Sequence, residues 1–213
     1  MRLYLSSFRV GDHPERLLSL LNTDRPVAVI ANAMDDAPED IRLAGVEREH
    51  TDLRALGLRT EEVDLRNYFA SHDGLAAEFS RFEVAWLRGG NVFMLRYALA
   101  RSGADQLLTD LLVRDELVYA GYSAGPCILA PSLRGLELCD HAEAVREVHG
   151  APPIWDGLGV LDCAIVPHYE SPGHPETEAL GKVAELYRST GVPHRTLHDG
   201  EVIVIDGPLT EII

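Results

Sequence analysis

The sequence contains few cysteines, no long apolar run and comparatively few basic residues. Three cysteines stand far apart in 213 residues, without a C-x-x-C pair, so we expect neither a disulfide framework nor a cysteine-based zinc site. No apolar run approaches the roughly 20 residues that a membrane-spanning helix needs. The first residues, MRLYLSSFRVGD, lack the apolar core of a signal peptide. A cytoplasmic protein is therefore expected.

Basic residues are strongly outnumbered, since 19 Lys and Arg face 34 Asp and Glu and give a formal net charge of −15. Binding of nucleic acid requires a basic face, so we expect no nucleic-acid partner. Because no long apolar run is present, no membrane partner is expected either. We interpret the acidity as a contribution to solubility. The histidines are scattered, and neither a metal nor an organic cofactor is predicted. The oligomeric state stays open, a homo-oligomer included.

Apolar strand-like segments alternate with amphipathic helix-like segments along the chain. This alternation predicts an α/β fold in one domain over 1–213, with a mostly parallel sheet and helices on both faces. Residues 132–160, which include two consecutive prolines and several glycines, are expected to form a long irregular loop. The spacing predicts strands at 2–7, 26–33, 58–65, 83–87, 117–120, 163–166 and 201–206, and helices at 13–22, 38–56, 92–100, 105–113 and 175–189.

The segment 117–131, LVYAGYSAGPCILAP, is the most informative about function. Its first apolar run ends in GYSAG at 121–125, and a second apolar run follows at once. A strand-to-helix turn of this G-x-S-x-G kind lifts a serine hydroxyl clear of the sheet. Gly121 and Gly125 would let the strand and the helix approach closely, and the Ala124 N–H would lie open at a helix start, which favours an oxyanion. The alternative is a serine that only caps a helix.

A serine hydroxyl needs a neighbouring base, and the base needs an acceptor that orients it. His168 is the best candidate base because it directly follows an apolar strand, although a packing histidine is the alternative. The orienting acid could be Asp199, Glu170 or Asp140, and the residues alone do not decide among them. Cys127 is close to the serine, but its place inside a helix argues against a nucleophilic role.

A glycine pair, Gly89-Gly90, follows the short apolar strand at 83–87. Glycines let the backbone come close to a substrate, and the Gly90 N–H could join the Ala124 N–H in holding an oxyanion. A tight turn before a helix is the alternative. Ligands of such folds bind at the carboxyl ends of the strands, so the glycine pair, the serine and the histidine are expected to form one site.

Four short segments follow one another along the chain, namely RGGNVF at 88–93, GYSAG at 121–125, PH at 167–168 and an acidic residue before glycine at 199–200. In this order they resemble the peptidase E group of serine peptidases. That group includes aspartyl dipeptidase and, more distantly, cyanophycinase, and it shares a flavodoxin-like three-layer fold with class I glutamine amidotransferases. The resemblance implies hydrolysis of short peptides by a dipeptidase or aminopeptidase. The amidotransferases carry cysteine at the turn, so the serine favours hydrolysis over ammonia transfer.

The resemblance also assigns roles to residues. Ser123 is implied to be the nucleophile, His168 its base and Asp199 the third member, while Gly90 and Ala124 supply the oxyanion donors. Candidate substrate contacts around them are Gly89, Asn91, Tyr169, Glu170 and Arg134.

Substrate selectivity is less well defined. Arg88 and Arg134 are the candidates for binding a substrate carboxylate. Aspartyl dipeptidase has a further aspartate after the nucleophile helix, for which Glu137 and Asp140 offer no clean match, so selectivity for N-terminal aspartate is not predicted. Two other functions stay open, namely hydrolysis of a different amide or ester, such as a cyanophycin-like polymer, and non-catalytic binding.

Overall fold

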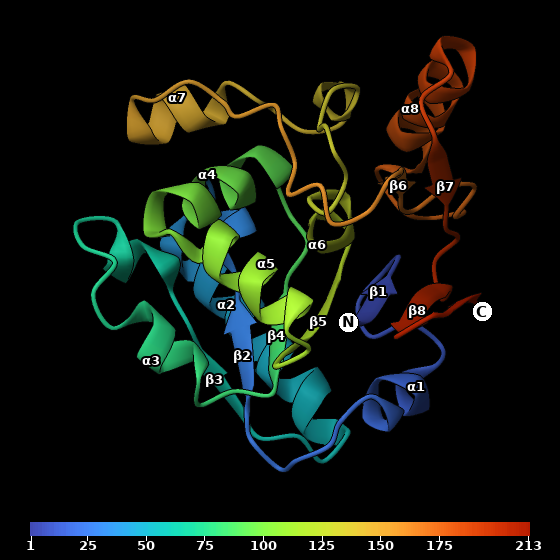
Figure 1. Ribbon diagram of the computed structural model, residues 1–213. Coiled ribbons are helices and arrows are strands. Elements are labelled where there is room, and N and C mark those ends of the chain that lie inside the picture. The colour runs from blue at the N-terminus through green and yellow to red at the C-terminus, as the bar shows by residue number, and fades with distance from the viewer.

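The computed structural model describes residues 1–213 and is built on a seven-stranded sheet with the strand order β3-β2-β4-β5-β1-β8-β9 (Figure 1). The first five strands in this order are parallel, and β8 and β9 run antiparallel to their neighbours. The mostly parallel sheet that the sequence predicts is therefore confirmed. The strands are β1 Arg2–Ser6, β2 Val27–Ile30, β3 Thr60–Glu62, β4 Val84–Leu87, β5 Val118–Tyr122, β8 Val202–Asp206 and β9 Leu209–Ile212.

Helices cover both faces of the sheet, because successive strand residues point to opposite sides. Val29 of β2 packs in one apolar cluster with Leu17 and Leu53 of the helices on one face. Its neighbour Ile30 packs in the other cluster, with Leu95 of the helices on the opposite face. The three-layer arrangement is thus confirmed. The helices of these layers are α1 Pro14–Ser19 and α2 Glu39–Ala55 on one face, and α3 Leu75–Phe79, α4 Val92–Ser102, α5 Ala104–Val113 and α6 Ala124–Cys127 on the other.

A second, two-stranded sheet lies beside the first and differs from the prediction. Here β6 (Ala164–Val166) pairs in parallel with β7 (His194–Thr196), and neither strand joins the central sheet. The strand expected at 163–166 is therefore present but belongs elsewhere. Figure 1 shows β6, β7 and α8 (Thr177–Thr190) together at one side of the molecule.

Residues 132–160 are more ordered than expected. They contain a 3-10 turn, η3 (Leu136–Leu138), and the helix α7 (Ala144–His149), which Figure 1 shows above α4. The prediction of a wholly irregular loop is therefore wrong for these two elements. Both are shorter than two helical turns, so they have too few residues for a helical repeat to show in the sequence.

Two predicted strands end early, because 3-10 turns follow them. The strand expected at 26–33 stops at Ile30, and η1 (Asn32–Met34) begins two residues later. The strand expected at 58–65 stops at Glu62. There the Asp64 carboxylate accepts the Arg66 N–H and caps the turn η2 (Leu65–Tyr68).

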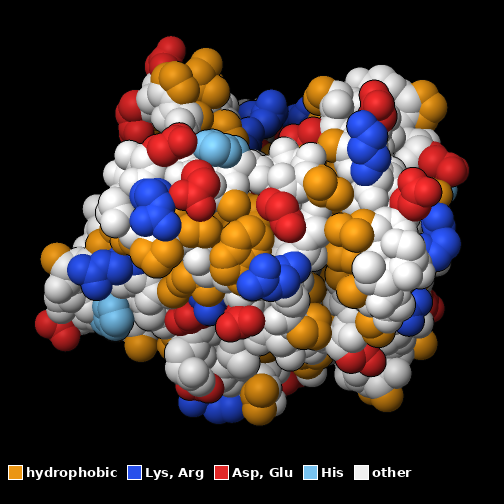
Figure 2. Space-filling view, turned by 90° about the horizontal axis from the view of Figure 1, so that it is seen from above, with side chains coloured by type: hydrophobic (Ala, Val, Ile, Leu, Met, Phe, Trp, Pro, Cys, Tyr) orange, Lys and Arg blue, Asp and Glu red, His pale blue; other side chains and the backbone are white.

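The distribution of charged side chains bears on the expectation that the protein has no basic face. On the face drawn in Figure 2, basic side chains are interspersed with acidic and hydrophobic ones and do not gather into one patch. None of the helices combines the length and the apolar character needed to cross a lipid bilayer.

Candidate active site

Ser123 lies at the sharp turn between β5 and α6, with φ 53° and ψ −108°. A residue other than glycine rarely adopts this conformation, and such strain concentrates at functional sites. The turn also needs its flanking glycines. A Cβ at Gly121 would lie 2.2 Å from the Leu87 carbonyl oxygen of β4, and a Cβ at Gly125 would lie 2.7 Å from the same oxygen. Both glycines are thus required by a close approach to the neighbouring strand β4, whereas the expected close approach was between the strand and the helix of the turn.

The serine side chain makes no capping hydrogen bond to α6. The alternative of a serine that merely caps the helix is therefore wrong for Ser123. Ala124 is the first residue of α6, so its N–H is one of those that find no acceptor within the helix.

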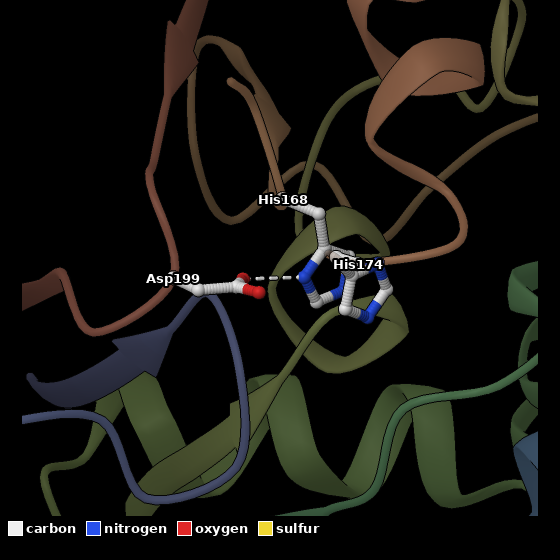
Figure 3. A group of neighbouring side chains, drawn as sticks. All are labelled: His168, His174 and Asp199. Atoms are coloured by element: carbon white, nitrogen blue, oxygen red, sulfur yellow. Dashed lines mark hydrogen bonds and ion pairs between the residues drawn. The ribbon is translucent and has the colours of Figure 1, made fainter. Parts of the chain in front are cut away.

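His168 and Asp199 are joined by a hydrogen bond of 2.6 Å between Nδ1 and Oδ1 (Figure 3). His168 is separated from β6 by Pro167 alone and is buried, with 1% of its surface exposed. Of the three acids left open by the sequence, Asp199 is the one that the structure brings to the histidine. Glu170 is exposed and makes no side-chain hydrogen bond, and the Asp140 carboxylate instead accepts the Val92 N–H.

A buried serine, Ser7, holds this pair against the central sheet. Its Oγ accepts the His168 N–H at 2.8 Å and donates to Asp199 Oδ1 at 3.0 Å. The Ser171 hydroxyl adds a further contact by accepting the Asp199 N–H at 2.8 Å. Because Ser7 directly follows β1, one hydroxyl fixes the histidine and the acid relative to the sheet that carries the strained serine.

A second histidine lies flat against the first. The ring centroids of His168 and His174 are 3.6 Å apart and their planes differ by 5° (Figure 3). Phe8 packs edge-on against both rings. Burial lowers the pKa of His168, the hydrogen bond with Asp199 opposes this, and the charge of His174 lowers it further. The net direction is downward, which favours the neutral imidazole that can accept a proton.

The three residues His168, His174 and Asp199 also offer ligand atoms within 4.8 Å of one another. An imidazole binds a metal through a nitrogen lone pair in its ring plane. Two parallel rings at 3.6 Å cannot both direct a lone pair at one ion. Since the hydrogen bond with Asp199 also occupies His168 Nδ1, the geometry fits a hydrogen-bonded pair better than a metal centre.

Ser123 and His168 line the same open pocket of about 170 Å³. No hydrogen bond joins their side chains in this structure, and contacts of this kind are often long before substrate binds. Gly89 and Gly90 line the same pocket, so the structure brings the glycine pair, the serine and the histidine together as predicted. The other lining residues are Phe8, Arg48, Arg88, Tyr122, His174, Pro175 and Glu176.

The neighbouring backbone requires a glycine at position 90. Its φ is 144°, and a Cβ there would lie 2.6 Å from the Ala33 carbonyl oxygen. The Gly90 N–H makes no hydrogen bond within the protein. Free N–H groups at Gly90 and at the start of α6 are what a developing oxyanion needs.

The remaining candidate substrate contacts lie outside the pocket. Asn91 caps α4 by accepting the Phe93 N–H at 3.0 Å. Tyr169 packs toward His198. Arg134 stacks over the Trp155 ring at 4.9 Å and lines a different cavity. Glu170 is exposed and contributes no lining atom.

The arginines of the pocket also differ from expectation. Arg88 is buried and paired with Glu49, its Nε 3.2 Å from Glu49 Oε1, so it is not free to bind a substrate carboxylate. Arg48 was not predicted. Its side chain is 47% exposed and lines the pocket from α2. An isolated arginine on a charged helix cannot be distinguished from a solvated surface residue without the fold.

Cys127 does not compete with the serine. It is buried, and its Sγ donates to the Ile165 carbonyl oxygen at 3.3 Å. Burial raises its pKa well above the ordinary value, which suppresses the reactive thiolate.

Comparison with known proteins finds the chain similar to peptidases. A model of peptidase family S51 matches residues 18–213. An uncharacterised peptidase of Pasteurella multocida strain Pm70 is 30% identical over 146 residues, which are 68% of this chain and 65% of that protein. A peptidase E of Streptomyces coelicolor is 30% identical over 135 residues, 62% of this chain and 52% of that protein. The chain thus spans roughly half to two thirds of the length of the relatives it matches.

The fold has solved counterparts. A crystal structure of a candidate peptidase E from Listeria monocytogenes EGD-e superposes with a TM-score of 0.80 at 23% identity, covering 100% of this chain and 97% of that one. A peptidase from an acI-B1 actinobacterium superposes with a TM-score of 0.71 at 14% identity, covering 100% and 86%. At these identities the likeness establishes the fold.

Proposed function

The chain belongs to peptidase family S51, and from this premise we propose that it is a serine peptidase of the peptidase E type that hydrolyses short peptides. One observation carries the proposal. A serine held in a strained strand-to-helix turn faces the same pocket as a buried histidine that is hydrogen-bonded to a carboxylate. These are the three groups that activate a serine for nucleophilic attack once the serine hydrogen-bonds to the imidazole.

In the proposed reaction, Ser123 Oγ attacks the carbonyl carbon of the scissile peptide bond. His168 Nε2 takes the hydroxyl proton, and Asp199 stabilises the imidazolium through Nδ1. The N–H groups of Gly90 and Ala124 hold the negative charge of the tetrahedral intermediate. Transfer of the proton from His168 to the leaving amine breaks the C–N bond and leaves an acyl-enzyme.

Water completes the cycle. His168 removes a proton from a water molecule as its oxygen attacks the acyl carbon, and then returns that proton to Ser123 Oγ. The products are a free carboxylate and the restored serine. A histidine whose pKa is lowered by burial is mostly neutral near neutral pH and ready for both steps.

The pocket supports a small substrate. Its volume of about 170 Å³ is below the ~300–1,000 Å³ that is common for larger ligands. Arg48 and Glu176 both line it. A short peptide carries both a carboxylate and an ammonium group, so charges of both signs at the pocket match its two ends.

The experiment is a dipeptide-library hydrolysis profile of the wild type beside Ser123→Ala. We expect the variant to lose hydrolysis across the whole library while its circular dichroism spectrum stays unchanged. A fluorophosphonate probe should label folded wild-type protein at Ser123 and should label neither the variant nor heat-unfolded protein. Undiminished hydrolysis by the variant would refute the mechanism, and absence of labelling would favour a non-catalytic binding domain.

A further inference from the structure

We propose that Arg88 is a positioning residue that sets the orientation of the oxyanion donor at Gly90, an inference that rests on the proposed function. The guanidinium NH1 of Arg88 donates a hydrogen bond of 2.7 Å to the Gly89 carbonyl oxygen. That carbonyl and the Gly90 N–H belong to the same peptide unit.

A trans peptide unit is planar, and its C=O and N–H point in opposite directions. Holding the Gly89 oxygen toward Arg88 therefore turns the Gly90 N–H to the other side. This orientation would turn the N–H toward the pocket that Gly90 lines together with Ser123. A Cβ at Gly89 would lie 2.9 Å from Ser123 Cβ, and the Gly90 N–H is engaged by no other acceptor in the protein.

The next peptide unit is fixed independently. The Asn91 N–H donates to the Ala33 carbonyl oxygen at 2.8 Å, and this same oxygen excludes any side chain at Gly90. Two successive glycines otherwise permit wide rotation of the unit between them. Arg88 supplies the side-chain contact that restrains this unit.

Arg88 is itself held in place by its ion pair with a buried carboxylate. Its counterion Glu49 is 1% exposed, and it accepts hydrogen bonds from Trp86 Nε1 at 2.9 Å and from the Tyr122 hydroxyl at 2.8 Å. Gly45 of α2 leaves the room for the guanidinium, since a Cβ there would lie 3.0 Å from Arg88 Nε. Glu49 therefore connects the residue before Ser123 with the residue before the glycine pair.

The burial of this ion pair favours an orienting role. Removing two charges from water costs about as much as their attraction returns, so a buried pair is a poor source of stability alone. Arg88 is 6% exposed and directs a hydrogen bond at one backbone carbonyl of the pocket.

The experiment compares kcat and KM for dipeptide hydrolysis in three variants. Arg88→Met removes the hydrogen bond, and Arg88→Met with Glu49→Gln removes it without leaving a buried charge unpaired. Arg96→Met is the matched control, because Arg96 also joins a carboxylate, Asp105 Oδ2 at 3.0 Å, to a backbone carbonyl, that of Asp156 at 2.8 Å. Arg96 does not line the pocket.

Loss of an oxyanion donor lowers kcat by about 10²–10³-fold, and a donor that is only misoriented retains part of its effect. We therefore expect both Arg88 variants to lose about 10- to 100-fold in kcat with little change in KM. The inhibition constant of a peptide aldehyde, which forms an oxyanion on the serine, should rise by a similar factor. Arg96→Met should keep the wild-type kcat.

Three outcomes would overturn the inference. They are an unchanged kcat in the double variant, a rise in KM alone, and an equal loss of kcat in Arg96→Met. Ser123→Ala, measured alongside, separates this failure from failure of the proposed function. If that variant is inactive while the Arg88 variants keep the wild-type kcat, only the role of Arg88 is refuted.

Discussion

The hydrogen bond between His168 and Asp199 leads to a prediction for Asp199→Asn. Both groups that contact Asp199 Oδ1, His168 Nδ1 and the Ser7 hydroxyl, are donors to it. An amide oxygen can accept from both in the same place. The substitution should therefore keep the imidazole in position and remove chiefly the negative charge.

The charge matters most when His168 becomes protonated during the reaction. Two unit charges about 4 Å apart interact by about 4 kcal/mol at an effective dielectric constant of about 20. This is an upper bound here, because the Asp199 side chain is 26% exposed. A hydrogen bond to a charged group contributes about 1.5–3 kcal/mol. The range of about 1.5–4 kcal/mol corresponds to a fall in kcat of roughly 10- to 10³-fold.

The pH profile gives an independent measure. The base must be neutral, so kcat/KM falls as the pH drops through the pKa of His168. The bond with Asp199 raises that pKa, so Asp199→Asn should shift the acid limb of the profile to lower pH. Glu170→Gln is the control, because Glu170 is exposed and should keep both kcat and the limb. An Asp199→Asn enzyme within twofold of the wild type, or an acid limb displaced to higher pH, would refute this reasoning.

Three other changes test separate parts of the structure. His174→Gln removes a charge that lowers the pKa of His168, so the acid limb of kcat/KM should move to higher pH, and a downward shift would contradict this. Gly121→Ala places a Cβ 2.2 Å from the Leu87 oxygen. The resulting overpacking and strain should lower the free energy of unfolding by about 2–5 kcal/mol. Calorimetry should therefore show a Tm lowered by roughly 5–15 °C. Burial raises the pKa of Asp140 to about 7, so ionisation weakens the fold as the pH rises from about 4 to 7, and Asp140→Asn should raise Tm more at pH 8 than at pH 5.

The strained serine and most of the central sheet could be predicted because their patterns are local. GYSAG at 121–125 encodes its turn in five consecutive residues, between two apolar runs long enough to recognise. The parallel strands β2, β4 and β5 are almost wholly apolar and buried on both faces, which is typical of a sheet covered on both sides.

The acid could be named but not chosen from the sequence. Asp199 reaches His168 because β7 pairs with β6, and β7 consists of His194, Arg195 and Thr196, which show no apolar alternation. Arg134, which was expected to contact the substrate, lies outside the pocket for the opposite reason. It is near Ser123 in sequence, but the chain leads away from the pocket after α6.

Ser7, Arg48 and Glu49 were not predicted, since each is a single polar residue with no accompanying motif. Ser7 resembles any serine at a strand end until His168 and Asp199 fold against it. Glu49 resembles a solvated charge on α2 until Trp86 covers it. Their roles arise from tertiary contacts between segments far apart in the chain.

The division of the site between two sheets affects how the protein would lose activity on heating. The serine belongs to the seven-stranded sheet, whereas the histidine precedes and the acid follows the segment that contains α8 and β7. Local openings of a protein need less free energy than global unfolding. A departure of residues 164–199 from Ser7 would separate the base from the nucleophile while the strand pairing of the seven-stranded sheet, to which neither β6 nor β7 belongs, stayed intact, so inactivation would precede the melting of that sheet.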